Sequence, residues 1–397
     1  MKIKKKTAIL GEISDSSLGK MLDQKKNKGI PQFYLGNKNV RWGCFDLSCL
    51  HMMPFEAHEM ERYSIQRGDL VICEGGEPGR CAIWEDTESI MYQKALHRVR
   101  FISGVNAYYV YYWLYNAGKK GLLDQYCTGS TIKHLPGDKL RTIAIDLPDE
   151  RIQTRIASIL RSMDLRIKNN EAINQNLSEQ IETILLKYLD EDGTSPVKLG
   201  DYLYIKGRIG WKGLKKDEYL PLSDYRIING ESLTKAGIDW DKAGYISEER
   251  YVESPEIMLK PGDILLSKDG TIGKIGYVDS LEKPTSVASG IFVIRNEKPD
   301  CISTTFIYYL LKSKLFDAFI AARTEGSVIP HLYQKDFMEF EFPLPNSIRM
   351  AEFESVAEPM FSLIVKNLNE NKRLAAMRDS ILPKLMSGEL DVSELDL

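Results

Sequence analysis

Two glycine-rich stretches of the sequence each end in a basic residue, a combination suited to contact with a phosphate. Residues 75–80 read GGEPGR and residues 268–274 read KDGTIGK. Neither fits the nucleotide-binding pattern GxxxxGK followed by Ser or Thr, because Lys274 is followed by Ile275. Each stretch therefore predicts either a tight hairpin, in which glycine supplies a positive φ, or a turn whose backbone amides and basic side chain approach a nucleic-acid phosphate. One turn can do both.

His134 and His331 recur at matching places, each shortly after a Gly-Ser pair. A nucleophilic Ser–His pair needs an acid to orient the histidine, and no acidic residue is placed at matching positions to do so. We interpret these histidines as loop residues that bond the backbone or face DNA. His51 and His58 lie seven positions apart without an HExxH motif, which disfavours a zinc hydrolase. We therefore predict no catalytic residue and no metal ligand in this chain.

The candidate DNA-binding residues combine the two turns and the histidine loops with a basic N-terminal region. The first forty residues contain nine lysines against Glu12, Asp15 and Asp23. The whole chain carries a net charge of −3, but local fields matter more than the total for binding a polyanion. The candidate set is Lys38, Arg41, Gly76, Arg80, Ser130, His134, Lys268, Thr271, Lys274, Ser327 and His331.

Each glycine turn lies inside a strand–turn–strand pattern, at residues 67–84 and 261–278. A helical segment whose aromatic side chains pack inward follows in each half, at residues 106–121 and 304–313. In the first half, residues 7–13 predict an opening strand, residues 14–28 an exposed loop or short helix, and residues 30–40 another strand. The same order recurs up to Pro345, so the sequence indicates a duplication.

Each half is followed by a long amphipathic segment. From Pro148 to Tyr188, apolar side chains including Ile173 recur in steps of mostly three and four, with Asn170 and Asn174 as polar interruptions. A shift of 197 positions places this segment on the one that follows Pro345. Such seams pair as coiled coils, and buried asparagines fix their register. The expected helix-pairing residues are Ile156, Met163, Ile167, Asn170, Leu177, Ile184, Ile364, Asn367, Leu374 and Ile381.

Two prolines interrupt the pattern of the second segment. Proline lacks the backbone N–H and its ring crowds the preceding turn. Pro359 therefore predicts a kink or the beginning of a new helix, and Pro383 predicts a frayed end.

Composition describes an ordinary globular protein and excludes several classes. The 397 residues are 43% hydrophobic and 27% charged. No apolar run approaches a membrane span, and no signal peptide is evident. The six cysteines form no CxxC pair, so a zinc site is disfavoured and reduced thiols in a cytoplasm are expected.

These patterns predict an α/β chain with α+β character. Two similar globular domains are separated by two long, antiparallel paired helices, with an internal pseudo-two-fold repeat. The predicted boundaries are 1–148 for the first domain, 149–192 for the central spacer helix, 193–345 for the second domain, and 346–397 for the C-terminal helix and tail.

The order of module, helix, module and helix resembles that of type I restriction-modification specificity subunits. The resemblance covers the whole chain and extends to residues 377–390, MRDSILPKLMSGEL, which are similar to the family's RDxLLPKLLSGE ending. It implies that each globular domain is a target-recognition domain for one half of a bipartite site in double-stranded DNA. It also implies that the helices space these domains and dock two methyltransferase subunits, which would carry S-adenosylmethionine, beside endonuclease/translocase subunits where the system cleaves DNA. This chain would then have no cofactor of its own, and it contains no NPPY or DPPY motif for adenine methylation.

Two other classes remain open from the sequence. One is a stand-alone DNA-modifying enzyme, which cofactor binding by the isolated chain would favour. The other is a pseudo-dimeric scaffold or regulator that binds DNA or protein outside restriction, for which a salt-insensitive complex without DNA would indicate the protein-binding form.

Overall fold

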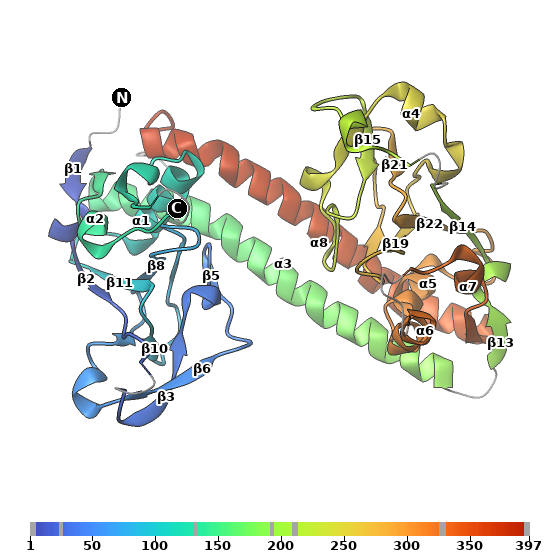
Figure 1. Ribbon diagram of the computed structural model, residues 1–397, viewed down its shortest axis with the longest axis horizontal. Coiled ribbons are helices and arrows are strands. Elements are labelled where there is room, and N and C mark those ends of the chain that lie inside the picture. The colour runs from blue at the N-terminus through green and yellow to red at the C-terminus, as the bar shows by residue number, and fades with distance from the viewer. Residues whose placement is uncertain are drawn as a thin grey trace. The chain divides into compact units, whose positions relative to one another are not determined.

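The computed structural model describes residues 5–23, 27–129, 133–190, 194–208, 213–324 and 331–392. Its two longest helices are α3 (Glu150–Asp190) and α8 (Ser347–Ser387), shown in Figure 1. The chain divides into two compact units, one made of Met1–Asn169 with Glu370–Leu397 and the other of Asn170–Asn369. Each unit contains one α/β module and one stretch of each long helix. Within the described part of the chain, no helix is both long enough and apolar enough to cross a membrane.

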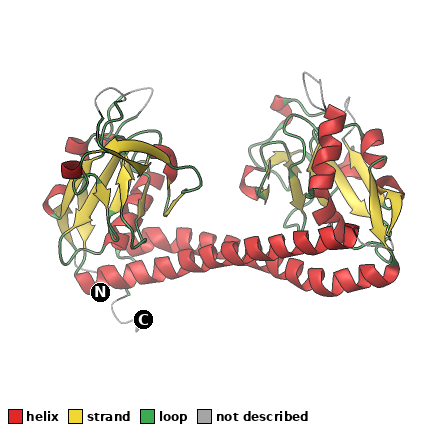
Figure 2. Cartoon of the chain, turned by 90° about the horizontal axis from the view of Figure 1, so that it is seen from below, coloured by secondary structure: helices red, strands yellow, loops and turns green. Residues whose placement is uncertain are grey.

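The first unit contains small sheets whose strands lie to one side of its stretches of the long helices (Figure 2). Antiparallel β1 (Lys6–Ile9) and β12 (Ala144–Leu147) form one sheet. A second has the order β2 (Ser14–Leu18), β11 (Leu96–Phe101), β8 (Leu70–Cys73) and β9 (Cys81–Ile83). A third has the order β6 (His51–Phe55), β3 (Ile30–Leu35), β10 (Ile90–Tyr92) and β7 (Ser64–Ile65). The unit also contains β4 (Val40–Arg41), β5 (Cys44–Phe45), α1 (Ala107–Lys119) and α2 (Gly137–Arg141).

The second unit repeats this plan. Antiparallel β13 (Thr194–Lys198) and β23 (Glu341–Pro345) form one sheet. The order β14 (Leu203–Gly207), β22 (Ile291–Asn296), β19 (Ile264–Ser267) and β20 (Ile275–Tyr277) forms the next, and β18 (Gly244–Ile246), β15 (Tyr225–Ile228) and β21 (Thr285–Val287) a third. The other elements are β16 (Leu233–Thr234), β17 (Gly237–Ile238), α4 (Glu248–Val252), α5 (Thr304–Leu311), α6 (Lys314–Thr324) and α7 (Gln334–Met338).

The strand pairings confirm the duplication that the sequence predicts. In each unit the hairpin around the glycine turn is the edge of the four-stranded sheet, and its inner strand pairs with the strand that precedes the aromatic helix. In each unit one pair is also parallel, β3 with β10 and β15 with β21. The fold class is therefore as predicted, two similar α/β modules with two long helices.

An ion pair with a buried carboxylate marks the same point of both modules. Asp69 accepts two hydrogen bonds of 2.7 Å from Arg100, and Asp263 accepts two of the same length from Arg295. Both carboxylates are almost fully buried. Each also accepts a backbone N–H three residues earlier, so it closes the turn that leads into the hairpin. A charge-assisted bidentate pair of this kind fixes geometry as well as energy.

The long helices begin alike, after a Leu-Pro pair and a capping side chain. The Asp149 carboxylate accepts the N–H of Ile152 at 3.0 Å, and the Asn346 side chain accepts the N–H of Arg349 at 3.1 Å. Each cap satisfies a helix N–H that has no partner within the helix. The two caps therefore set the starts of α3 and α8 at Glu150 and Ser347.

Contacts between α3 and α8 run antiparallel within each unit. In the first unit, Asp164 binds Arg378 and Arg166 binds Glu370; in the second, Asn174 binds Asn367. This last contact is a buried amide pair of 2.8 Å, and Asn174 also donates to the carbonyl of Ile364 at 3.4 Å. Of the expected helix-pairing residues, Ile156, Asn170, Ile364 and Asn367 are buried, and Met163, Ile167, Leu177, Ile184, Leu374 and Ile381 are half-buried.

Several expectations for individual segments are wrong. Residues 14–18, part of the stretch 14–28 predicted as loop or helix, form strand β2, because each of them pairs with β11 and Asp15 binds Arg98 at 2.6 Å. The opening strand predicted over residues 7–13 is interrupted by a 3₁₀ turn, Leu10–Glu12, which buries Leu10. Ile173 does not belong to the seam, since it is 44% exposed and buried Asn170 and Asn174 occupy the seam there.

The predictions that Pro359 begins a new helix and that Pro383 frays the end are also wrong. Helix α8 is continuous through both positions and ends at Ser387. Pro359 lies on the exposed side of the helix, whereas Phe353, Ala357 and Phe361 bury the opposite side in the core. Packing of that buried side outweighs the lost backbone hydrogen bond.

Candidate nucleic-acid interface

The glycine turns join the two strands of equivalent hairpins. Gly76 and Gly79 have φ of 79° and 87°, and Gly270 and Gly273 have φ of 65° and 89°. These values lie in the left-handed region, which glycine adopts without steric cost. A Cβ at Gly79 would also come within 2.4 Å of the Leu123 side chain. The glycines thus have the structural role that the sequence predicts, and both turns have the same backbone form.

The histidine loop docks against the hairpin turn in both units. The N–H of Leu135 donates to the carbonyl of Glu74 at 2.6 Å, and the N–H of Leu332 donates to the carbonyl of Lys268 at 2.9 Å. His134 is exposed and forms backbone bridges to Gly75 and Thr128. His331 bridges to Asp269 and also contacts its carboxylate through Nδ1. Backbone pairing therefore brings each histidine to the turn.

The basic residue of each turn donates a hydrogen bond to a third loop. Arg80 donates to the carbonyl of Asn37 at 3.1 Å, and the Asn37 side chain donates back to the carbonyl of Gly75 at 3.0 Å. In the second unit, Lys274 Nζ donates to the carbonyl of Gly230 at 2.9 Å. The Arg80 side chain is only 15% exposed and also pairs with Glu77, so its established contacts are internal. A phosphate contact for either cation stays a prediction.

Three loops therefore meet in each unit, and we call each group a loop cluster. The first cluster consists of residues 36–39, 74–80, 127–129 and 133–135, and the second of residues 229–231, 268–274 and 331–333. Backbone and side-chain hydrogen bonds connect the loops of each cluster. These bonds fix the positions of the exposed groups relative to one another.

The remaining candidates have varied surroundings. Lys38 and Thr271 are exposed, and Arg41 is half exposed with its guanidinium 3.8 Å from Asp46. Lys268 Nζ lies 4.9 Å from the centre of the Phe292 ring, and its burial lowers its pKa while the Asp269 charge opposes that change. Ser130 and Ser327 lie outside the described residues.

Buried titratable groups below the first cluster do not show the geometry of a reaction site. Burial lowers the pKa of His97, whose Nε2 lies 3.1 Å from the carbonyl of Leu135. Burial raises the pKa of Cys73 to about 11, against the attraction of Arg80. The directions of both pKa shifts favour the uncharged forms of His97 and Cys73, which are the forms expected for side chains packed inside the module. Among the described residues, Glu56, His58 and Glu59 could surround a cation, but Glu59 is bound by Lys20.

Sequence reasoning missed the partners that hold the clusters together. Asn37 and Asp269 each bind a neighbouring loop, yet neither recurs as the same residue type in the other copy. The alignment of the two turns does contain one signal, because Asp269 stands where the first copy has Gly75. At Gly75 an added Cβ would lie 3.0 Å from His134 Nδ1, so glycine leaves room for the ring that aspartate binds in the other copy.

Comparisons with known proteins agree on one family. A family model described as the type I restriction modification DNA specificity domain matches residues 4–179 and again residues 192–350. The specificity subunit of the type I restriction enzyme MjaIX from Methanocaldococcus jannaschii is 26% identical over 317 residues, covering 74% of this chain and 71% of that protein. The MjaVIII specificity subunit of the same organism is 23% identical over 309 residues, covering 70% of this chain and 69% of that protein.

A solved structure shares the fold. The S subunit of a type I restriction-modification system from M. genitalium superposes with a TM-score of 0.61 at 17% sequence identity, covering 96% of each chain. At that identity the likeness shows the fold alone, and it extends over both modules and both long helices.

Proposed function

Because the chain belongs to the type I restriction-modification DNA specificity family, we propose that each of its two units reads one half of a bipartite site in double-stranded DNA. As in its curated relatives, the chain serves as a specificity subunit, and it recognises DNA without catalysing a reaction. The observation that carries the two-half proposal is the repeated loop cluster. The same three loops meet in both units, and the residues that they display differ.

The differences between the clusters supply the basis for two different half-sites. Framework glycines are shared, whereas Gly75 and Glu77-Pro78 in the first turn stand opposite Asp269 and Thr271-Ile272 in the second. Phosphate contacts position a protein on DNA, and base-edge contacts specify the sequence. The two loop clusters share a backbone arrangement but expose different side chains. This arrangement therefore suits two modules that approach DNA in the same way and read different bases.

The long helices are proposed to space the two half-sites and to dock two methyltransferase subunits. Both helices expose large apolar side chains that a partner would cover. They are Leu165, Ile173 and Leu186 on α3, and Ile348, Val356, Leu363, Leu368 and Met377 on α8. The methyl donor S-adenosylmethionine then binds the partner subunits, and endonuclease/translocase subunits join where the system also cleaves DNA.

The test is to express the chain with its methyltransferase subunits and to map methylated bases in the DNA of the host cells. We expect one bipartite sequence with a gap of constant length. The isolated chain should transfer no methyl group to DNA. Methylation that is independent of sequence, or that remains when the chain is omitted, would contradict the proposal.

A further inference from the structure

Strands β3 and β6 of the first unit expose an apolar surface. Phe33 and Met52 are partners in the antiparallel register, and each side chain is 53% exposed. Pro31 and Pro54 form another register pair, two positions along the same side of the sheet. We call these four residues the β3–β6 face. A cluster of large apolar side chains on a sheet surface indicates that another molecule covers it.

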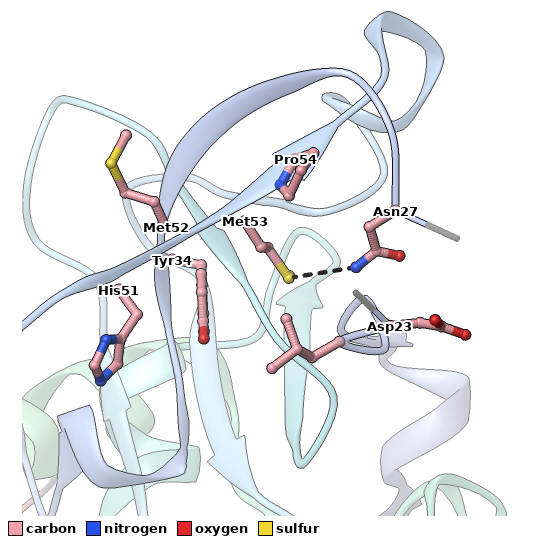
Figure 3. Close-up of a pocket in the computed structure, with 8 residues that line it drawn as sticks. Asp23, Asn27, Tyr34, His51, Met52, Met53 and Pro54 are labelled. Carbon is pink, nitrogen blue, oxygen red and sulfur yellow. Dashed lines mark hydrogen bonds between the residues drawn. The ribbon is translucent and has the colours of Figure 1, made fainter. Parts of the chain in front are cut away.

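The opposite side of the same strands belongs to the core. Met53 and Phe55 are each 1% exposed and pack with Tyr34 and Met91. Met52 and Met53 leave the strand on opposite sides, and Asn27 Nδ2 lies 4.0 Å from the Met53 sulfur (Figure 3). Exchanging Phe33 or Met52 therefore alters the surface while the packed side stays intact.

In the second unit, cationic side chains of the same unit lie over the equivalent surface. The parallel pairings of β3 and β15 align the two units and place Arg226 and Tyr245 where the first unit has Phe33 and Met52. The Arg226 guanidinium lies 5.5 Å from the Trp240 ring and 5.7 Å from the Tyr245 ring. Lys283 Nζ lies 5.7 Å from the Tyr245 ring as well. Of the two units, the first is therefore the one that leaves an apolar pair, Phe33 and Met52, exposed at this position.

Charge and continuity indicate what covers the β3–β6 face. Exposed Lys28 and Lys38 flank the two ends of β3, and the strand leads directly into Asn37 of the first loop cluster. A strand of this length spans about 20 Å, which equals the rise of about six base pairs. Duplex DNA offers phosphates for the flanking lysines and apolar base edges, such as thymine methyl groups, for the side chains between them. Phe, Met and Pro are also residue types that proteins insert between base steps.

We propose that the β3–β6 face contacts bases of the half-site read by the first unit, with Phe33 and Met52 making the apolar contacts. The proposal rests on the proposed function and adds a reading surface beyond the loop clusters. The two units then differ in the chemistry of recognition, because the second unit fills the equivalent place with Arg226 and Tyr245.

The experiment uses the double variant Phe33→Thr with Met52→Thr in the full chain assembled with its methyltransferase subunits. Threonine keeps the strand preference, and both positions are exposed, so the thermal unfolding midpoint should stay unchanged. Affinity for a duplex carrying the full site is measured over a range of salt concentrations. We expect about tenfold weaker binding, since apolar base contacts contribute to discrimination. The salt dependence should keep its slope because no cation is lost.

The matched control is Ile102→Thr, which removes an equally exposed apolar side chain of the same unit outside the β3–β6 face. It should bind as the wild type does. Methylation mapping should show relaxed sequence in one half-site of the double variant and no change in the other. Binding within twofold of the wild type with both half-sites unchanged would overturn the inference. So would failure of the double variant to assemble with the methyltransferase subunits, since a protein would then cover the face. If the wild-type complex itself shows no sequence-dependent methylation, the proposed function fails instead.

Discussion

Both modules contact the long helices through an equivalent tyrosine, Tyr112 in the first unit and Tyr309 in the second, but these tyrosines meet different chemistry. In the first unit, the Tyr112 hydroxyl donates to the Asp164 carboxylate at 2.5 Å. Arg378 binds the same carboxylate at 2.6 Å and the Tyr115 hydroxyl at 3.2 Å. The first module is therefore held on α3 and α8 by a partly buried charged network.

In the second unit the equivalent contact is aromatic. The repeat aligns Tyr308 and Tyr309 with Tyr111 and Tyr112, Phe361 with Asp164, and Ile181 with Arg378. The Phe361 ring lies 4.9 Å from Tyr277, 5.1 Å from Tyr308 and 6.0 Å from Tyr309, centre to centre. Phe361 is 5% exposed, so burial and ring contacts contribute to holding this module on its helices, beside the Thr305 hydroxyl, which donates to Glu358 of α8 at 2.5 Å.

The difference between the charged and the aromatic contact suggests how each module of a duplicated chain docks at its own site on the long helices and not at the other. If the first module docked at Phe361, the charges of Asp164 and Arg378 would lose their module partners. A buried polar group without a partner costs far more than the net gain from a satisfied one. We infer that the aromatic contact supplies stability and that the charged contact supplies selectivity between two otherwise similar docking sites.

Exchanging the chemistry of the aromatic contact should have the largest effect. Phe361→Asp removes a buried ring and places a carboxylate opposite Ile181, which cannot pair with it. We expect the free energy of unfolding of the second unit to fall by about 5 kcal/mol or more. Urea unfolding, with protease cleavage sites assigned within residues 170–369, measures this. The control Phe361→Leu should cost about 1 kcal/mol. Equal effects of the two variants would contradict an apolar contact.

Breaking the charged contact should cost less and should be recoverable. Arg378→Met leaves the Asp164 carboxylate without its cation, and we expect the first unit to lose about 2–4 kcal/mol. Adding Asp164→Leu removes the orphaned charge, so the double variant should regain at least half of that loss. Hydrogen exchange along the C-terminal part of α8 measures both. If the losses of the two single variants simply add, the pair does not act as one unit.

The smallest expected effect is the acid dependence that Asp379 gives to the first unit. Burial alone would raise the pKa of Asp379, but the hydrogen bond from Lys119 and the charge of Arg378 bring it below its usual value. A lowered carboxyl pKa adds stability above the unfolded value of about 4, and that stability is lost as pH falls through the folded pKa. Because the side chain is 36% exposed, the contribution should be below about 1 kcal/mol.

Asp379→Asn tests this by comparison with the wild type between pH 7 and pH 3. The difference in unfolding free energy of the first unit should shrink below about pH 4. The second unit should show no change, because Asp379 belongs to the first unit. A difference that stays constant down to pH 3 would mean that Asp379 does not titrate as proposed.

Much of the fold could be predicted from the sequence because duplication makes weak patterns visible twice. The glycine turns, the aromatic helices and the two long amphipathic segments recur in order. The failures have a common physical reason. Polar β2 is a strand because β11 pairs with it, and Pro359 remains helical because the opposite side of α8 is packed, so tertiary contacts outweigh local preference.

The candidate interface was less predictable than the fold. The turns and histidines were found because they recur, and the structure brings them together in both units. The charged and aromatic contacts were missed because Asp164 and Phe361 do not recur as one residue type. The β3–β6 face was missed for a similar reason, since exposure of Phe33 and Met52 depends on which side of the sheet the rest of the module covers.

The central claim is that the two units read DNA independently, each through its own module. The most direct test replaces residues 194–345 with a second copy of residues 6–148 and adds Phe361→Asp with Ile181→Arg, so that the copied module finds the charged contact that it needs. Methylated bases are then mapped with the methyltransferase subunits present. The account predicts a site made of two copies of the half-site read by the first unit. Methylation of a site whose halves still differ would contradict it.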